Sequence, residues 1–257
     1  DSLCDALIMA WYPGQAGGRA LARILFGDVA PSAKLPVTFP RSTSDLPPFS
    51  DYAINGRTYR YSDNFSYPFG FGLTYGRISL ETAVVAFAGV EEAGGYGAYG
   101  ESPAQPVGDP TQREVEIAVP ARYFAYRAGA ARERAIPSPF RVYRPRFRFR
   151  LRIKNGGTRE IREMIQVYIR HPEVPNTPRW QFAGVAGATV APLMATEPTI
   201  EVPLSNLTVV DTHGVRYLPT GPIDIWIGTS SPGGEVLGAA SPIIGRLRLI
   251  TDASRDA

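Results

Sequence analysis

The spacing of hydrophobic residues changes along the chain and divides it into segments of different expected structure. Residues Ala6–Ala10 are a continuous apolar run, typical of a strand buried on both faces of a parallel sheet. A glycine-rich turn at 14–18 follows it. The helix predicted after that turn ends at Gly27 and carries three apolar residues at three- and four-residue spacing, Leu21, Ile24 and Leu25. The pattern therefore predicts a strand, a turn and a helix from a parallel sheet.

No second copy of this pattern follows. A parallel strand needs neighbouring strands that are joined by crossover helices. After Phe39 the sequence predicts only loops and antiparallel strands. We therefore expect the neighbours of Ala6–Ala10 to lie before Asp1 or in another polypeptide, which makes this a severed or processed chain.

Residues Gly27–Tyr75 are interrupted by six prolines, which exclude a long helix and favour an extended segment that crosses a surface. We call this segment the strap. Its many aromatic residues are expected to anchor it to the domains beneath rather than to stack on sugars: Phe39, Phe49, Tyr52, Tyr59, Tyr61, Tyr67, Phe69, Phe71 and Tyr75. Arg57 and Arg60 are expected to hold carbonyl groups of the strap rather than sugar hydroxyls.

From Pro145 the sequence predicts antiparallel β-structure. Between 147 and 153, every second residue is apolar and the residues between are arginines, before a turn at Asn155–Gly157. Strands are also predicted at Thr74–Phe87, Met164–Ile169, Thr199–Val202 and Ile223–Ile227, at intervals typical of a β-sandwich.

Four arginines, which we call the arginine ladder, share the polar face of that first alternating strand: Arg146, Arg148, Arg150 and Arg152. Like charges two residues apart repel, so this surface needs an acidic partner or an anionic ligand. Residues 89–141 read as an insertion that contains a short strand at Glu114–Val119 and a mixed, basic stretch at Arg122–Arg134. We expect Glu114 and Glu116 to cover the ladder; the alternative is an acidic glycan or a partner chain.

The N-terminal motifs resemble a known family. WYPGQAGGRALARILFGDVAPSAKLPVTFP resembles the closing segment of the α/β sandwich domain in family 3 glycoside hydrolases, the β-glucosidase and β-xylosidase group. LPPFSDY, GRTYRY and YPFGFGLTY follow in the order and spacing that this family uses before its C-terminal fibronectin-like domain. IKNGGTREIREMIQVYIRHP is similar to paired central strands of the fibronectin type III-like domain of that family. Two residues depart from the family pattern: Ala16 replaces an acidic residue and Ala33 a glycine.

The resemblance and the residue patterns together predict an α/β fragment, a strand-turn-helix from a parallel sheet, followed by an all-β fibronectin type III-like sandwich. The expected units are the closing segment of the α/β domain at 1–45, the Pro- and aromatic-rich part of the strap at 46–73, the sandwich at 74–250 with its insertion at 89–141, and a tail at 251–257.

No catalytic residue is assigned to the chain. Retaining glycoside hydrolysis needs two carboxyl groups. The resemblance implies that the nucleophilic aspartate belongs to an N-terminal barrel and the acid/base glutamate to a part before Asp1. The strap aspartates lie in loops where carboxylates commonly cap or form turns: Asp28, Asp45, Asp51 and Asp63. His171 and His213 are too few and too far apart for a metal site, and we expect no cofactor and no metal.

The first interpretation is the C-terminal part of a β-glycosidase that hydrolyses terminal β-linked sugars only with its barrel. One alternative is a noncatalytic assembly subunit derived from such an enzyme, which could be glycosylated and form fibres. Another is a carbohydrate-binding module. The expected partners are the barrel or a neighbouring subunit, and carbohydrate. A formal charge of +3 over 257 residues gives no case for nucleic acid binding, and no apolar run could span a membrane.

The resemblance implies a secreted or extracellular protein. Two triplets fit the N-glycosylation pattern, at Asn64 and Asn206. Cys4, which is the single cysteine, is expected to be buried because cysteine usually is.

Overall fold

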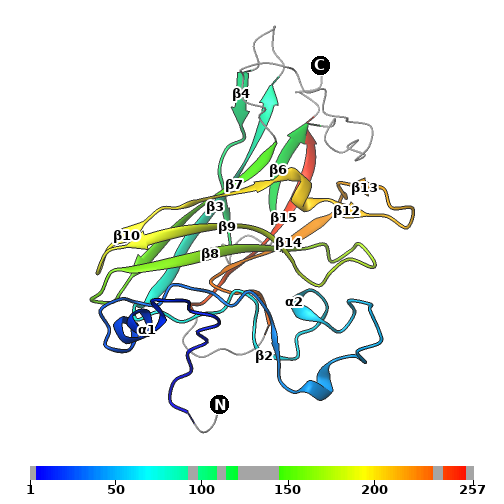
Figure 1. The fold of residues 1–257 in the computed structure, drawn as a ribbon. Helices are drawn as coiled ribbons and strands as arrows, with labels where there is room; N and C mark the ends of the chain where they lie inside the picture. Colours follow the sequence, from blue (N-terminus) through cyan, green and yellow to red (C-terminus); the bar gives the residue numbers. More distant parts are fainter. Residues whose placement is uncertain (1–3, 92–97, 109–113, 121–144, 234–239, 253–257) are drawn as a thin grey trace.

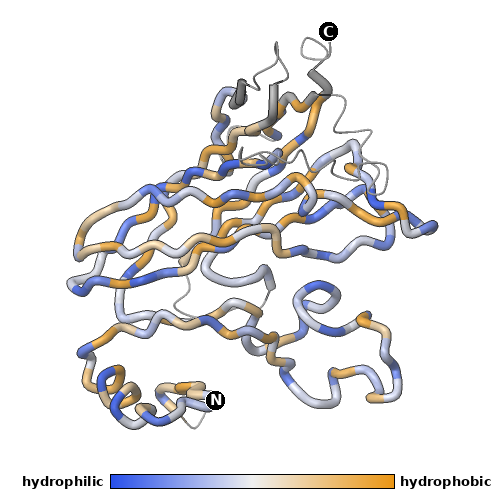
Figure 2. The backbone as a smooth tube through the Cα atoms, turned by 45° about the horizontal axis from the view of Figure 1, so that its top comes forward, coloured by the Kyte–Doolittle hydropathy of each residue, from blue (hydrophilic) through white to orange (hydrophobic). Residues whose placement is uncertain are grey.

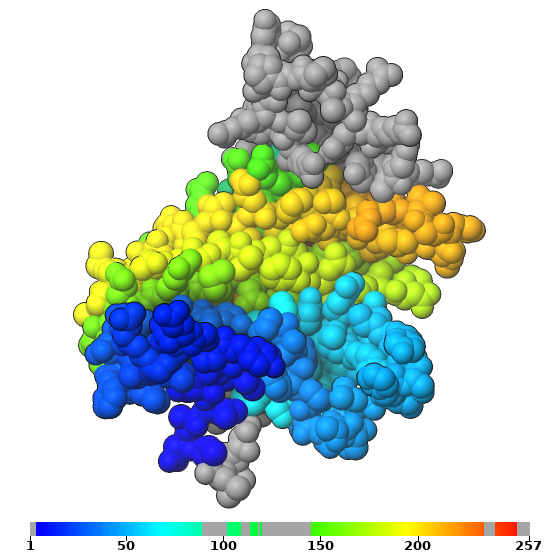
Figure 3. Space-filling model, viewed as in Figure 1, coloured from blue at the N-terminus to red at the C-terminus, as the bar shows by residue number. Residues whose placement is uncertain are grey.

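A computed structural model describes residues 4–91, 98–108, 114–120, 145–233 and 240–252. Two β-sheets pack face to face, and the N-terminal residues run beneath them as a separate layer (Figure 1). In the space-filling view this layer, blue to cyan, follows one side of the sandwich along its length (Figure 3). The expected order of an α/β fragment followed by a β-sandwich is therefore confirmed.

The N-terminal layer has little regular structure, as its prolines require. It contains helix α1 (Gly17–Leu25), the two-residue strand β1 (Phe39–Pro40), the 3-10 turn η1 (Thr43–Asp45), the single-turn helix α2 (Thr58–Tyr61) and β2 (Phe65–Tyr67), which pairs with β1. Helix α1 has the predicted position and ends before Gly27, whose φ of 77° suits glycine. Its N-cap residue, Ala16, makes no capping hydrogen bond. An acidic residue at this position could provide that bond.

The first sheet is organised around two long neighbouring strands, β3 (Ile78–Glu91) and β7 (Arg146–Asn155). Strands β4 (Ala98–Glu101) and β5 (Gln105–Val107) pair with β3, while β10 (Ala195–Thr196) and β11 (Thr199–Pro203) pair with β7. All of these pairs are antiparallel.

The second sheet has the order β6 (Val115–Pro120), β15 (Ile243–Asp252), β14 (Pro222–Gly228), β8 (Ile161–Arg170) and β9 (Gln181–Val190). A 3-10 turn, η3 (Leu204–Leu207), and a small pair formed by β12 (Val209–Val210) and β13 (Arg216–Tyr217) lie between β11 and β14 along the chain.

The core lies between the two sheets and follows from the alternation of the strands. Phe147, Phe149, Leu151 and Ile153 of β7 are at most 2% exposed, while the intervening arginines point away from the core. The four apolar side chains pack with inward residues of the second sheet such as Ile165. Figure 2 shows hydrophobic stretches, in orange, along the strands in the middle of the sandwich. The predicted alternation of β7 is confirmed.

Two predicted pairings are wrong. The run that resembles paired central strands forms β7 and β8, but these strands lie in opposite sheets, so the turn at Asn155–Gly157 carries the chain across the end of the sandwich. The Asn155 side chain, which is fully buried, holds this crossing by donating to the carbonyls of Arg159 and Val190. The expectation of antiparallel strands alone also fails, because β6 pairs with β15 in parallel.

The residues predicted as an insertion contribute strands to both sheets. Strands β4 and β5 extend the first sheet, and β6, predicted at Glu114–Val119, forms an edge of the second. The basic stretch Arg122–Arg134 lies outside the described residues.

The predicted strand Ala6–Ala10 has no ladder partner among the described residues and is not assigned as a strand. Leu7, Ile8 and Met9 are 43–62% exposed. Cys4 is exposed too, contrary to expectation, because no other part of the described chain covers this segment. A strand of a parallel sheet cannot form without a neighbour, so the isolated segment leaves its hydrogen-bonding groups to solvent.

His171, which follows β8, provides a test of the packing of the sandwich. It is 5% exposed and its Nε2 atom has no hydrogen-bond partner. Burial lowers the pKa of His171 to about 4, although a backbone hydrogen bond with Leu207 opposes this shift. The unfolded chain therefore binds a proton near pH 6.5 that the folded chain resists until about pH 4.

We expect the stability that His171 contributes to be complete above pH 6.5 and to be lost as the pH falls towards 4, by about 3 kcal/mol in all. Urea unfolding of the chain and of His171→Leu at pH 7 and pH 4.5 measures this difference. His171→Leu should show a smaller loss on acidification, whereas His213→Leu, at an exposed position, should behave like the parent chain. Equal pH dependence in the parent and His171→Leu would contradict this assignment.

Candidate functional site

The strap binds the outer face of the second sheet through a cluster of aromatic rings. Tyr59 stacks on Phe69 with ring centroids 5.1 Å apart and meets Tyr168 of β8 edge-on at 5.4 Å. Phe182 of β9 contacts both Phe69 and Tyr168. The expectation that strap aromatics anchor it to the domain beneath is confirmed for Tyr59 and Phe69.

Polar contacts fix the same junction. Burial raises the pKa of Tyr168, and burial likewise raises that of Tyr59, so both phenols stay protonated. The Tyr168 hydroxyl donates to Oε1 of Gln166 at 2.5 Å, and the Gln166 amide donates to the carbonyls of Gly70 and Thr229 at 3.1 Å. Gly70 has a φ of 78° and lies directly against Gln166, so a larger residue would not fit there.

A buried ion pair lies where the strap meets the start of the sandwich. Lys34 Nζ is 2.5 Å from Glu163 Oε1, and their side chains are 11% and 4% exposed. Lys34 also donates to the carbonyl of Gly72, which joins the two halves of the strap. Sequence reasoning missed this pair. The available signal was a glutamate on the same strand face as the buried Ile161 and Ile165.

The two strap arginines have different surroundings. Arg57 donates to the carbonyls of Ala53, Pro48 and Asp51, as expected. Arg60 lies over the Tyr61 ring at 5.8 Å, and its Nε is buried without a hydrogen-bond partner among the described residues.

Thr58, between the two strap arginines, has a φ of 57°, which is unfavourable for a β-branched residue. Such strain persists only where the surroundings enforce it, and it is frequent near functional sites.

A second group of aromatic residues has no cover in the described chain. Tyr12, Phe26, Phe49 and Tyr52 are 84–99% exposed. Together with Ala6–Ala10 they place large apolar side chains at the surface of the N-terminal layer. Single exposed apolar residues are common, but several in one layer indicate an interaction surface. We call these residues the uncovered surface.

Three of the four strap aspartates act as local caps or form an ion pair. Asp45 accepts from the backbone of Ser42 at the start of η1, and Asp51 accepts from the backbone of Ala53. Asp63 pairs with Arg179 at 2.7 Å. Asp45 and Asp51 thus have the predicted capping and turn-forming roles, and Asp63 forms an ion pair that the sequence did not predict. In the described ranges no cluster of three or more histidine, cysteine or acidic residues could hold a metal ion.

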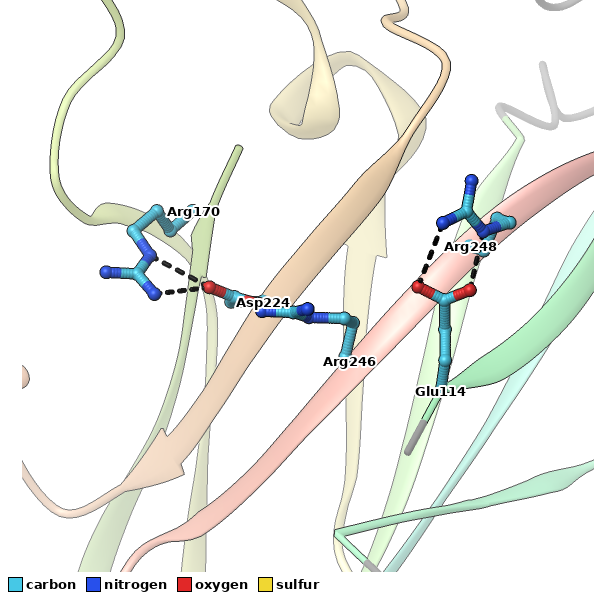
Figure 4. A network of polar contacts seen from close by, with 5 residues as sticks. All are labelled: Glu114, Arg170, Asp224, Arg246 and Arg248. Atoms are coloured by element: carbon cyan, nitrogen blue, oxygen red, sulfur yellow. Dashed lines mark hydrogen bonds and ion pairs between the residues drawn. The ribbon is translucent and has the colours of Figure 1, made fainter. Parts of the chain in front are cut away.

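The outer face of the second sheet carries a network of ion pairs that connects its strands (Figure 4). Asp224 of β14, with a side chain 8% exposed, binds Arg170 of β8 at 2.5 Å and Arg246 of β15 at 2.7 Å. Arg248 of β15 binds Glu114, which precedes β6, at 2.5 Å. These contacts hold four adjacent strands together.

This network corrects the expected partners of the arginine ladder. Glu114 binds Arg248, and β6 lies in the other sheet, so Glu114 and Glu116 do not cover the ladder. The acidic partners found are residues of the first sheet or next to it: Arg146 and Arg148 bind Glu201, while Arg152 binds Glu81 and Glu197. Partial burial alone would raise the pKa of Glu201, but Arg146 and Arg148 outweigh it and lower that pKa.

The two N-glycosylation triplets differ in accessibility. Asn64 and Ser66 are both exposed. The Asn206 amide instead donates to the carbonyl of Ala183 at 2.8 Å, and Thr208 is 3% exposed and donates to the carbonyl of Ser205.

Comparison with known proteins assigns both parts of the chain. Residues 1–75 match the model of the glycosyl hydrolase family 3 C-terminal domain, and residues 163–231 match the fibronectin type III-like domain. A xylan 1,4-beta-xylosidase of Xylanibacter ruminicola is 51% identical over 85 residues, which are 33% of this chain and 10% of that protein. A periplasmic beta-glucosidase of Salmonella typhimurium is 41% identical over 88 residues, 29% of this chain and 12% of its own length.

Solved structures agree on the fold. A β-glucosidase from Erythrobacter marinus superposes on 94% of this chain and 25% of its own, with a TM-score of 0.59 and 24% identity. A β-glucosidase from Listeria innocua covers 96% of this chain and 28% of its own, with a TM-score of 0.61 and 17% identity. The chain thus spans only about a tenth to a quarter of the length of these proteins. The predicted resemblance is confirmed.

Among the described residues, no helix is long and apolar enough to cross a membrane.

The buried ion pair between strap and sandwich gives a test of this junction. Lys34→Met would leave Glu163 buried without its cation, which we expect to cost about 3–5 kcal/mol in the free energy of unfolding. Lys34→Met combined with Glu163→Leu removes both charges and should recover most of that loss. Chemical denaturation measures the free energy of unfolding of the parent chain, of Lys34→Met and of the double variant.

The control is Arg179→Met, which breaks the exposed pair with Asp63 and should cost no more than about 1 kcal/mol. If Lys34→Met were as mild as this control, the ion pair would not secure the strap.

Proposed function

We propose that this chain, which corresponds to the C-terminal part of a family 3 glycoside hydrolase, completes a β-glycosidase that removes terminal β-linked sugars. The catalytic carboxyl groups come from segments outside the chain, as the family resemblance implies, and the chain itself supplies the closing segment of the α/β domain, the strap and the sandwich. The names of the relatives support a β-glucosidase or β-xylosidase activity.

The observation that carries this proposal is the division of the N-terminal layer into two sides. One side is bound to the sandwich by Tyr59, Phe69 and the Lys34–Glu163 pair. The other is the uncovered surface, where Ala6–Ala10 has no strand beside it within the described chain. Strand edges and large apolar side chains of this kind are expected to be covered in the working protein.

The physical requirement is strong because each backbone group buried without a hydrogen bond costs roughly 1–3 kcal/mol. A strand of a parallel sheet obtains those bonds only from neighbouring strands. The catalytic portion of the same enzyme is the proposed source of these neighbours, with carbohydrate as the substrate.

A location outside the cytoplasm belongs to the same proposal and is supported by the periplasmic name of one relative. If the protein passes through a glycosylating pathway, Asn64 is the proposed acceptor, because Asn206 is engaged with Ala183.

We expect the purified chain to have no turnover on aryl β-glucosides or aryl β-xylosides, because the family resemblance implies that both catalytic carboxyl groups lie in segments outside it. The complete enzyme, expressed from the longer coding sequence, should hydrolyse at least one of them. In that enzyme, Leu7→Asp should lower the amount of folded, active protein severely, since it places a charge in a strand buried on both faces.

Asp51→Asn in the complete enzyme is the matched control and should leave the chemical step intact. Turnover by the isolated chain that Asp51→Asn or another change of its own carboxylates abolishes would place the active site here and overturn the proposal. An inactive full-length protein that forms ordered oligomers through residues 4–26 would favour the assembly subunit instead.

A further inference from the structure

The outer face of the first sheet has a small hollow at the arginine ladder, on the side of the sandwich opposite the sheet that holds the strap. Its volume is about 270 Å³. Val84 and Ala86 of β3 and Ala104 form its apolar part. Its polar part comes from neighbouring strands: Arg148, Arg150, Thr199 and Glu201.

Arg150 differs from the other three arginines of the ladder. Each of those has a glutamate partner, whereas the Arg150 guanidinium forms no ion pair or hydrogen bond with any residue in the part of the chain that the structure describes. The partners found for the other three arginines are Glu81, Glu197 and Glu201, and none of these three glutamates pairs with Arg150.

Strand register places suitable groups on both sides of Arg150. Thr199 of β11 lies directly across from it, and Val84 of β3 lies across on the other side. An exposed guanidinium is thus flanked by a hydroxyl and by an aliphatic surface. Both β3 and β11 pair with β7 along several residues, so these groups are held on rigid strands rather than on loops.

This combination fits a particular ligand chemistry. The planar guanidinium binds a carboxylate through two parallel hydrogen bonds. The threonine hydroxyl can donate or accept a further bond, and the aliphatic surface suits the C–H face of a sugar ring. Since small-molecule sites are usually about 300–1,000 Å³, the hollow suits one ring rather than a longer ligand. A single guanidinium without an acidic partner among the described residues, with the Glu201 carboxylate in the rim, favours a monoanion over a dianion.

We propose that this hollow binds a hexuronic acid, a single sugar ring with one carboxylate, through Arg150 and Thr199. Such a site would let the sandwich hold an acidic glycan while the missing catalytic portion acts elsewhere. The inference does not depend on the proposed glycosidase activity, because it uses only residues of the first sheet.

The test is a titration of the 257-residue chain with sodium glucuronate at constant low ionic strength, followed by calorimetry and by the NMR signal of the Arg150 Nε–H group. We expect saturable binding and a shift of that signal. Glucose at the same concentrations should not bind, and sodium acetate should bind at least about tenfold more weakly because it lacks the ring. Arg150→Gln should weaken glucuronate binding roughly tenfold or more, and Thr199→Val should weaken it less.

The matched control is Arg152→Gln, on the same strand and face, which should weaken binding much less than Arg150→Gln because the Arg152 guanidinium is occupied by Glu81 and Glu197. Thermal unfolding of each variant checks that it is folded, and the NMR titration of the parent chain needs no variant. Acetate binding as well as glucuronate would mean an unspecific anion site, and glucuronate binding unchanged by Arg150→Gln would mean another site. Either result, or no binding, would overturn the proposal.

Discussion

Backbone groups in a buried strand must find hydrogen-bond partners, and this requirement governs how the N-terminal part of the chain can be understood. Ala6–Ala10 has the composition of a strand covered on both faces, yet the described residues offer it no neighbour. Helix α1 is in the same position, since Leu25, on its apolar face, is 67% exposed. Burial of this segment elsewhere would recover about 25 cal/mol for each Å² of apolar surface removed from water.

The strap connects the segment Ala6–Ala10 and helix α1 to the β-sandwich. The sandwich has a continuous core and its own cross-strand ion pairs, such as those of Asp224. The strap uses aromatic stacking at Tyr59 and Phe69 and the Gln166 amide to bind the outer face of the second sheet, and the Lys34–Glu163 pair fixes it where it meets the start of the sandwich. Because these contacts are mostly buried, they hold the N-terminal layer in a defined position on the sandwich. The sandwich can thereby orient the closing segment towards the sheet that it is proposed to join.

The sequence allowed the local elements to be predicted but not all of their pairings. Helix α1 and the alternation of β7 depend on spacing along the chain, which is visible directly. The placement of β7 and β8 in opposite sheets depends on which faces pack together. The alternation of apolar and polar residues is the same whether two strands pair in one sheet or lie in opposite sheets.

The ladder shows the same limit at the level of side chains. Its partners Glu81 and Glu201 are more than fifty residues away from the arginines they bind. Glu114 and Glu116 had the right spacing, but their strand joined the other sheet. Conversely, Arg57 was predicted correctly because its acceptors lie within ten residues. The partners of side chains could therefore be predicted only where they lie close in sequence, because the pairing of distant strands is not visible in the sequence.

The most direct test of the account is amide hydrogen exchange at Ala6–Ala10, measured in the 257-residue chain and in the complete enzyme. We predict fast exchange in the isolated chain and strong protection, comparable to that of β8, in the complete enzyme, because a neighbouring strand then takes up these amides. Exchange at Ala6–Ala10 that is equally fast in both would show that no strand pairs with this segment, and it would contradict the proposal that the chain completes a catalytic α/β domain.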